Sequence, residues 1–250
     1  MRILAIHAHP DDWEILAGGT LALLAQAGHE VMTVTMSDGD CGTKDLPREE
    51  IGSLRRGEAL KAARMIGASY EWGGFHDLSI FVDDLSRRRV TALLRRLRPE
   101  IVLTSAPIDY MCDHEATCAL VRDACFAAGA PNYQLEGQQK APLDHIPALY
   151  YMDPVEGVDR DGRPVAPDFV VNVTTTFALK RDLLACHESQ REWLRAHHGM
   201  DNYLITMEQW TRRRGQDAGF DYGEGFRQYR GHPYPHEPVL QNLLRAYVAP

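Results

Sequence analysis

Short apolar runs alternate with longer amphipathic segments along the first half of the chain. Residues 2–6 and 31–36 are short, mostly apolar runs that are typical of buried strands. Between them, residues 15–27 form a compact apolar helical pattern, and Gly28 follows where a C-cap glycine belongs. A strand, a helix and a strand in this order predict a right-handed crossover between two parallel strands.

The same alternation continues along the chain. Helices are predicted over residues 47–66 and 84–97, and strands over residues 69–72 and 101–105. The second of these helices is rich in arginine, which predicts a solvated face. Four strands that alternate with three helices predict an α/β fold, Rossmann-like and doubly wound, with a mainly parallel sheet and helices on both faces. Because no composition break, linker or repeat interrupts the sequence, we expect one domain over residues 1–250.

The second half of the chain shows a weaker pattern. Residues 148–152 and 169–173 are predicted to be further strands, with a turn-rich segment between them. A long helix is predicted to start at Thr175 or Thr176 and to pass through residues 183–193. The histidines of this helix are expected on its surface: His187, His197 and His198.

Composition narrows the classes of partner. A hydrophobic content of 44% and a charged content of 25% are ordinary for a soluble globular protein. The net charge of −8 argues against nucleic acid or an anionic membrane as the main partner. No apolar run approaches transmembrane length, and the first residues are predicted to form a strand rather than a basic leader. We therefore expect a cytoplasmic protein with a small-molecule partner.

The cysteines also favour the cytoplasm as the compartment. There are five, an odd number, and none forms a CxxC pair, which favours reduced thiols. Cys118 and Cys125 lie seven residues apart on an apolar helical face and are predicted to be core residues. Cys112 lies close to a histidine discussed below and stays open as a weak candidate metal ligand.

Polar side chains follow the first predicted strand in the sequence HAHPDDWE. Open parallel sheets place their ligand crevice outside the carboxyl ends of the strands. His9 and Asp12 are three residues apart, so on a helical turn they share a face and could hold a divalent metal. Asp11, one position off, is then a free carboxylate near the metal, suited to take a proton from water. The alternative is that these aspartates only cap the helix that follows.

A second polar cluster follows the fourth predicted strand. Asp113 and His114 stand at the start of a helix, on the same edge of the sheet as His9 and Asp12. His114 can project into the same crevice, which would complete a His, Asp, His triad with a fourth position open to water. Asp113 could orient an imidazole as an outer carboxylate.

Other polar and aromatic residues have two interpretations each. Arg55 and Glu58 are three residues apart and could form a surface ion pair, worth under about 1 kcal/mol. Aromatic residues late in the chain could stack on a sugar, although core or subunit packing is their more common use. They are Tyr203, Trp210, Phe220, Tyr222, Phe226 and Tyr229.

These residues resemble the LmbE-like or PIG-L-type zinc N-acetyl deacetylases. The family pattern is AHPDD after the first strand, then E and GG, and HxDH after a later strand. This chain has AHPDDWE, Gly18, Gly19 and then MCDH, with an RxxEA stretch from Arg55 to Ala59. The resemblance covers roughly the first 130 residues, with a looser match through FRQYRGHPYP near the end.

The resemblance implies roles for individual residues. Three residues would be zinc ligands: His9, Asp12 and His114. Fe²⁺ or another divalent metal is the alternative to Zn²⁺. Asp11 would be the general base that activates water, and Arg55 would contact the substrate, with Asp77 as a second candidate. The implied reaction is hydrolysis of the acetamide of an N-acetylated sugar or conjugate of the N-acetylglucosamine type, with residues 130–250 shaping the pocket.

One position departs from the family pattern. Met111 stands where the HxDH motif has its first histidine. In many members that histidine is thought to stabilise the oxyanion or to protonate the leaving amine, and methionine can do neither. Tyr110, His232 and His236 are candidates to replace it. Alternatively, Asp11 could return the proton that it takes from water.

Two other functions stay open at this point. One is a metal-dependent hydratase or lyase that acts on an unsaturated carboxylic acid, in which Arg55 would hold a carboxylate. The other is a non-catalytic metal- or sugar-binding protein, which only Met111 favours. The sequence also leaves a homo-oligomer open.

Overall fold

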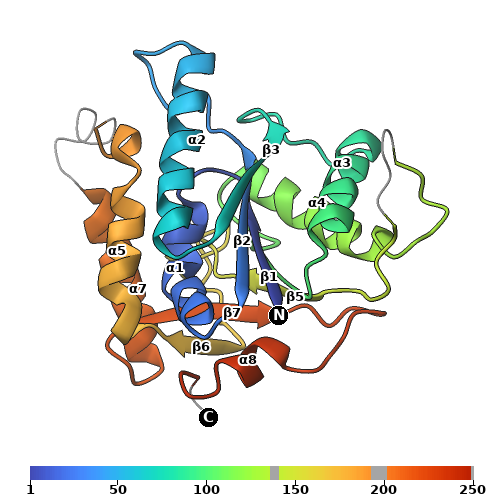
Figure 1. Cartoon of the computed structure of the whole chain (residues 1–250). Coiled ribbons are helices and arrows are strands. Elements are labelled where there is room, and N and C mark those ends of the chain that lie inside the picture. Colours follow the sequence, from blue (N-terminus) through green and yellow to red (C-terminus); the bar gives the residue numbers. More distant parts are fainter. Residues whose placement is uncertain (136–140, 193–201, 249–250) are drawn as a thin grey trace.

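The computed structural model describes residues 1–135, 141–192 and 202–248. Its centre is a seven-stranded sheet in the order β3-β2-β1-β4-β5-β7-β6 (Figure 1). The strands are β1 (Arg2–His7), β2 (Glu30–Ser37), β3 (Ser69–Phe75), β4 (Ile101–Thr104), β5 (Ala148–Met152), β6 (Phe169–Asn172) and β7 (Gly223–Gln228). Strands β1 to β5 pair in parallel, whereas β7 is antiparallel to both β5 and β6.

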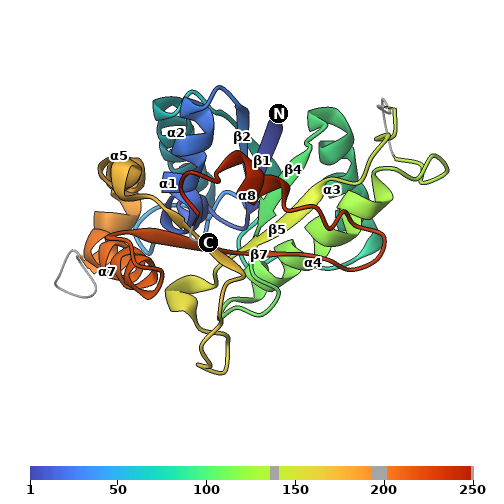
Figure 2. The ribbon, with the colours of Figure 1, turned by 90° about the horizontal axis from the view of Figure 1, so that it is seen from below.

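Helices cover both faces of the sheet, as Figure 2 shows for α1 and α2 on one side and α3 and α4 on the other. The helices on the first face are α1 (Asp12–Gln26), α2 (Arg48–Met65), α5 (Phe177–Ala185) and α8 (Val239–Leu243). Those on the second face are α3 (Asp84–Leu97) and α4 (Cys112–Ala127). Helix α7 (Asn202–Asp217) packs beside α5 and β7, and two 3-10 turns, η1 (Val155–Gly157) and η2 (Thr174–Thr176), flank β6. The predicted α/β fold with a mostly parallel sheet is confirmed.

Alternate residues of β1 point into two separate cores. Ile3 and Ala5 lie in the core beneath α1, and Leu4 and Ile6 lie in the core beneath α3 and α4. All four side chains are fully buried. Because this strand is covered on both faces, its sequence is an uninterrupted apolar run.

Several predicted boundaries differ from those observed. Helix α1 begins at Asp12, three residues before the predicted start, and β3 continues to Phe75. The long helix predicted from Thr175 or Thr176 is interrupted, because α5 ends at Ala185. Trp193, His197 and His198 lie outside the described residues.

The break after α5 turns His187 into the protein. His187 is fully buried, and its Nε2 lies 2.7 Å from Oε1 of Glu14, which is also fully buried. The pKa of His187 is raised, because the Glu14 carboxylate outweighs the lowering effect of burial. The prediction that His187 lies on the surface was therefore wrong.

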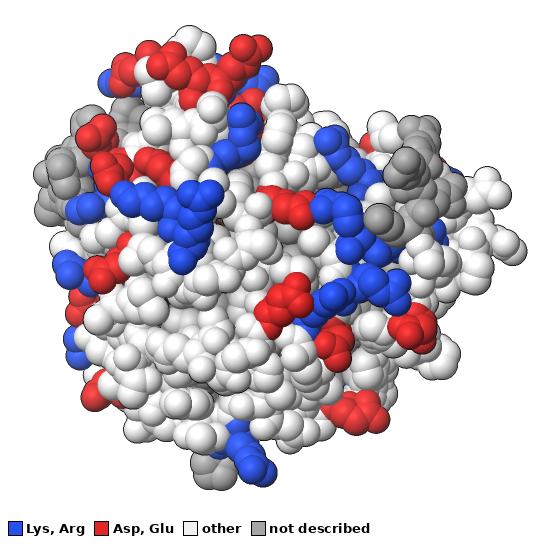
Figure 3. Space-filling view, viewed as in Figure 1, with Lys and Arg blue, Asp and Glu red and all other residues white. Residues whose placement is uncertain are grey.

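Helix α3 carries the expected arginines, which appear as blue side chains on the right of Figure 3. Arg96 binds Glu71 through two contacts of 2.6 and 2.5 Å at the surface. Arg95 is instead buried and donates to the carbonyl oxygens of Ala128 and Ala130, which follow the end of α4. The predicted solvated face is present, but Arg95 lies outside it.

A buried ion pair fixes α1 against α5 and β7. Nζ of Lys180 lies 2.5 Å from Oε1 of Glu224, and the Glu224 carboxylate accepts the N–H groups of Gly19 and Thr20 at 2.9 and 2.7 Å. A Cβ at Gly19 would lie 2.6 Å from Cβ of Val173. Glycine at this position therefore allows close packing of α1 against the segment after β6.

The five cysteines are all free. Cys118 and Cys125 lie on the buried face of α4, as predicted, whereas Cys41 and Cys112 are exposed. Within the described part of the chain, we find no helix with the length and apolar character needed to cross a membrane.

Candidate metal-dependent active site

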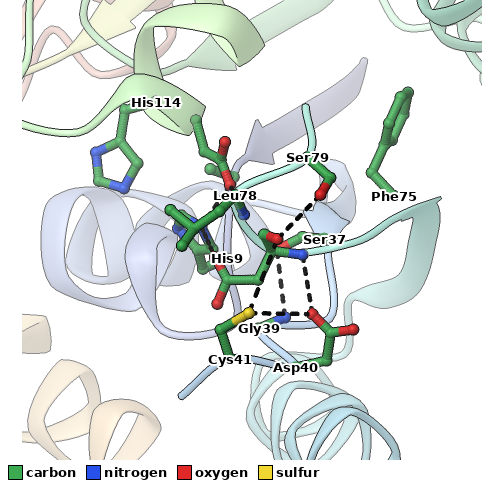
Figure 4. Close-up of polar contacts among 12 residues, drawn as sticks. His9, Ser37, Gly39, Asp40, Cys41, Phe75, Leu78, Ser79 and His114 are labelled. Atoms are coloured by element: carbon green, nitrogen blue, oxygen red, sulfur yellow. Dashed lines mark hydrogen bonds and ion pairs between the residues drawn. The ribbon is translucent and has the colours of Figure 1, made fainter. Parts of the chain in front are cut away.

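The carboxyl ends of β1, β3 and β4 bring the predicted site residues to one edge of the sheet. His9, Asp11 and Asp12 follow β1, Asp77 follows β3, and the segment from Asp109 to His114 follows β4. Figure 4 shows His114 at the upper left of this region, with His9 between it and the loop that carries Asp40 and Cys41. The polar clusters therefore meet where the alternation of strands and helices predicted them.

Asp12 lies between the two imidazoles predicted as metal ligands. Its Oδ2 is 3.3 Å from Nδ1 of His9, and its Oδ1 is 3.4 Å from Nε2 of His114. The centroids of the two imidazole rings are 5.3 Å apart. All three residues are buried. The structure thus brings His9, Asp12 and His114 together.

The far nitrogen of each imidazole faces another carboxylate. Nδ1 of His114 is 3.0 Å from Oδ1 of Asp109, and Nε2 of His9 is 3.4 Å from Oδ2 of Asp113 and 3.2 Å from Oδ1 of Asp77. Outer carboxylates commonly fix the tautomer and orientation of metal-binding histidines. Asp113 lies where its predicted orienting role requires. Asp109 has the same relation to His114 and was missed, although it lies only five residues away.

The ionisation of these groups fits a cation site. Burial lowers the pKa of His114, but the carboxylates of Asp12 and Asp109 outweigh it and raise this pKa to about 9. The pKa of Asp12 is well below its ordinary value despite burial, because His7 and His114 favour the carboxylate. Among the described residues, the buried Nε2 of His114 has no hydrogen-bond partner. A buried imidazole nitrogen aimed at a carboxylate fits a shared divalent cation.

His7 is a third imidazole beside Asp12, and the sequence predicted no role for it. It is fully buried, and its Nδ1 lies 2.6 Å from Oδ2 of Asp12. Ligand atoms of His7, Asp12 and His114 all lie within 4.8 Å of one another. His9 forms a separate group with Asp77 and Asp113. His7 is therefore a competing ligand. The signal for it was its place at the end of the strand, two residues before His9.

Asp11 stands apart from this group. It occupies the residue before α1 with a φ of +99°, a left-handed conformation that is uncommon for a residue other than glycine. Its side chain makes no capping hydrogen bond, so the alternative interpretation as a helix cap does not hold for Asp11. Instead, its Oδ2 accepts the hydroxyl of Tyr203 at 2.5 Å and lies 3.3 Å from Nη2 of Arg55.

Arg55 is held inside the protein rather than on its surface. Its exposed fraction is 4%, and it donates to the carbonyl oxygens of Pro10 and Gly39 at 2.8 and 3.0 Å as well as to Asp11. Glu58 bonds instead to the segment that follows α5. The predicted surface ion pair between Arg55 and Glu58 was therefore wrong. The observed bonds of Arg55 support the loop that carries Asp11.

The contact between Tyr203 and Asp11 was not predicted from the sequence. Tyr203 comes from α7, and its hydroxyl donates to Asp11. Burial and the neighbouring Asp11 carboxylate raise the pKa of Tyr203 well above its ordinary value, so the phenol keeps its proton. The sequence predicts for this residue only stacking on a sugar or packing in the core or between subunits. No local pattern links it to Asp11, because 192 residues separate the two.

The candidates to replace the histidine missing at Met111 lie in different places. Tyr110 is at the mouth of the site, with its ring 5.3 Å from that of His114 and an exposed fraction of 65%. His232 lines a groove of about 530 Å³ beside the carboxyl-terminal half of α4, whereas His114 lies in the first turn of that helix. His236 is exposed and bonds to a nearby backbone carbonyl. The structure does not bring either carboxyl-terminal histidine to the site.

Cationic side chains around the site are paired with carboxylates. Asp40, in the loop after β2, lies 2.8 Å from Nδ1 of His76 and 2.9 Å from Nη2 of Arg48, and it accepts the N–H of Asp77 at 3.0 Å. The pKa of Asp40 is lowered, since these contacts outweigh its desolvation. The loop after β2 thereby holds the loop after β3 in place.

Comparison with known proteins agrees with this geometry. Residues 4–125 match the family model described as PIG-L: GlcNAc-PI de-N-acetylase. Just under half of the chain is thus similar to the PIG-L (LmbE-like) family. The matched region contains the AHPDD and MCDH motifs, and the predicted resemblance is confirmed.

Relatives of this chain include two kinds of enzyme. The chain is 25% identical over 242 residues to diacetylchitobiose deacetylase of Thermococcus kodakarensis, covering 90% of this chain and 82% of the relative. It is 28% identical over 195 residues to 4-oxalmesaconate hydratase of Pseudomonas putida, covering 75% and 73%. The solved structure of N,N'-diacetylchitobiose deacetylase from Pyrococcus horikoshii superposes with a TM-score of 0.76 and 25% identity, covering 95% of this chain and 88% of that one.

Proposed function

We propose that this protein is a metal-dependent hydrolase that removes the acetyl group from an N-acetylated sugar or sugar conjugate. The observation that carries the proposal is the separation of Asp11 from the buried imidazole and carboxylate cluster. Asp11 is held by Tyr203 and Arg55, whereas Asp12 faces the imidazoles. A water-activating base and a ligand set must be distinct in this way.

The residues for the metal follow from the same geometry. His9, Asp12 and His114 would hold a divalent cation, with Zn²⁺ as the first candidate and Fe²⁺ as the second. When bound, such a cation polarises an acyl carbonyl and lowers the pKa of water. Two imidazoles and one carboxylate leave room in the coordination sphere for substrate or water.

Asp11 would move the proton in both halves of the reaction. It takes a proton from the attacking water as the water oxygen bonds to the acetamide carbon. It then gives that proton to the nitrogen as the carbon–nitrogen bond breaks, which yields acetate and an amine. This double use of Asp11 removes the need for a histidine at Met111. Tyr203 and Arg55 would hold one carboxylate oxygen while the other reacts.

The hydratase is the second candidate, and the relative from Pseudomonas putida supports it. An unsaturated carboxylic acid calls for a cation that can bind its carboxylate. Arg55, the residue expected to do so, already donates to three oxygen atoms of the protein. Arg48 and His76 are both bound to Asp40. The pairing of these cations therefore favours a neutral acetamide as substrate.

Elemental analysis and product analysis test the proposal together. Protein purified without an affinity metal is compared as wild type, Asp11→Asn and Asp144→Asn, the last being an exposed carboxylate in the loop before β5. We expect near one zinc or iron per chain in all three. Acetate release from N-acetylglucosamine and N,N'-diacetylchitobiose should be lost only in Asp11→Asn.

The other outcomes support a rival function or contradict the assignment of base and ligands. Addition of water to an unsaturated acid without acetate release would support the hydratase. Absence of metal after reconstitution would support the non-catalytic binding protein. Loss of metal in Asp11→Asn would show that the assignment of base and ligands is wrong.

A further inference from the structure

Apolar side chains remain exposed on the two loops that flank the candidate site. They are Leu78, Phe81 and Val82 in the loop after β3, and Ile108 and Tyr110 in the loop between β4 and α4. The same two loops supply Asp77 and Asp109 to the site, and Asp113 follows the second loop in the first turn of α4. Neighbouring exposed apolar side chains of this kind commonly mark a binding surface.

Leu78 is tied to the site through its backbone. Its N–H donates to Oδ2 of Asp113 at 2.7 Å, and the same oxygen lies 3.4 Å from Nε2 of His9. In Figure 4, Leu78 lies between His114 and the loop that carries Asp40 and Cys41.

The backbone of Leu78 has a φ of +58°, in the left-handed region that favours glycine. A leucine in that conformation costs free energy. Its side chain is 56% exposed, so burial does little to offset the cost. Strained residues of this kind cluster at active sites and at segments that hold a ligand.

Tyr110 provides a second apolar surface next to a predicted ligand. Its ring meets the ring of His114 edge to face at 5.3 Å, and 65% of the residue is exposed. An aromatic ring placed in this way offers a large apolar contact area at small entropic cost. Leu78 contacts the His9 side of the site through Asp113, and Tyr110 contacts the His114 side.

The cationic side chains near these residues are already paired within the protein. Arg48 and His76 are bound to Asp40, and Arg55 is bound within the protein. No described cation in this set is left free to bind an anionic group on the substrate. The surface thus suits a neutral apolar group.

We propose that the site takes N-acetyl compounds that carry an apolar group, such as an aromatic aglycone, beside the acetamide, and that Leu78 and Tyr110 contact this group. The inference rests on the proposed function and names its substrate class. A substrate is the occupant, rather than a second copy of the chain, because both residues adjoin the predicted ligands. A protein seated on them would close the site to any substrate.

The test compares 4-nitrophenyl N-acetyl-β-D-glucosaminide with N-acetylglucosamine, using acetate release to obtain kcat/KM for each. Leu78→Gly removes the side chain and suits the left-handed backbone, and Tyr110→Ala removes the ring. Leu85→Ser is the matched control, because Leu85 is 68% exposed on the first turn of α3, seven residues further along.

We expect the wild type to prefer the aryl glycoside by about tenfold or more, mainly through KM, which is the discrimination that one apolar contact usually provides. Leu78→Gly and Tyr110→Ala should each reduce this preference by about tenfold with metal content unchanged. Leu85→Ser should keep it.

Failure of this inference and failure of the proposed function give different results. A wild-type ratio near one, with acetate released from both compounds, overturns the inference and leaves the hydrolase standing. Absence of acetate from both compounds overturns the hydrolase. A ratio unchanged in Leu78→Gly, together with a change from dimer to monomer, would show that the surface joins two copies and would overturn the inference.

Discussion

Arg55 and Asp11 lie 3.3 Å apart, Nη2 to Oδ2, although 44 residues separate them in the sequence. The hydroxyl of Tyr203 donates to the same oxygen from α7. Two donors on one oxygen fix the orientation of the carboxylate, so the position of the candidate base depends on α2 and α7 as well as on β1. An enzyme that relies on a positioned base loses rate when that base moves by a fraction of an ångström.

Tyr203→Phe should lower kcat by about 10- to 100-fold, because it removes one donor to Asp11 and leaves the ring in place. Metal content should not change. Tyr222→Phe is the matched control, since its hydroxyl bonds to Glu208 and its ring stacks on Phe177, away from Asp11. Steady-state assays of acetate release measure the effect. An unchanged kcat in Tyr203→Phe would mean that the hydroxyl does not support the base.

His9 and His7 compete for the role of third ligand, and alanine variants separate them. His9→Ala should lose the metal, because Nδ1 of His9 faces Asp12 while its other nitrogen is backed by carboxylates. His7→Ala should keep the metal with an affinity lowered about 10- to 100-fold, as expected for a residue that orients a ligand. Elemental analysis after dialysis against a chelator measures both. His76→Ala, at an exposed site nearby, is the control. The reverse pattern would make His7 the ligand.

The central strands were predictable because they are buried on both faces, and their sequences are therefore short, mostly apolar runs. Strand β7 was not predicted, since Gly223–Gln228 contains two glycines and no apolar run. Its formation depends on pairing with β5 and β6, which no local pattern encodes. Propensity and periodicity describe neighbours in the chain, whereas this strand is specified by distant partners.

The same distinction applies to the site. His9, Asp12 and His114 were predictable because each follows a strand near the centre of the sheet, where carboxyl ends meet. Tyr203 and the buried pair of His187 with Glu14 were not, because they join residues more than 170 positions apart. A helical pattern indicates which face is apolar, but it does not identify the side chain that reaches a given carboxylate.

Lys180→Met should lower the free energy of unfolding by about 3 to 5 kcal/mol, because it leaves the buried Glu224 carboxylate without its cation. Glu224 also binds the N–H groups of Gly19 and Thr20, so the loss should loosen the packing of α1. Lys61→Met is the control, since Lys61 pairs with Glu188 in solvent and its loss should have no measurable effect. Urea unfolding of the metal-free proteins compares them. Equal stability of the two variants would show that the buried ion pair of Lys180 and Glu224 does not stabilise the packing of α1.

Asp153 should make stability depend on pH. Burial raises its pKa from 3.8 to about 6, although Arg214 opposes the shift. Between these values the folded chain keeps a proton that the unfolded chain has lost, so the contribution of Asp153 to stability falls as pH rises. The shift corresponds to at most about 3 kcal/mol. The free energy of unfolding of wild type relative to Asp153→Asn should therefore fall between pH 4 and pH 7. A constant difference would show that the pKa is not raised.

Asp109→Asn should weaken metal binding by about 10- to 100-fold without abolishing it, because the carboxylate orients His114 but does not face Asp12. Asparagine keeps the shape and removes the charge that favours a fixed imidazole tautomer. Asp123→Asn, on the outer part of the same helix and paired with Arg122, is the matched control and should bind metal as the wild type does. Competition with a chromogenic chelator gives the affinities. A loss of metal as complete as in His114→Ala would make Asp109 a ligand, whereas wild-type affinity would mean that His114 is oriented by packing alone.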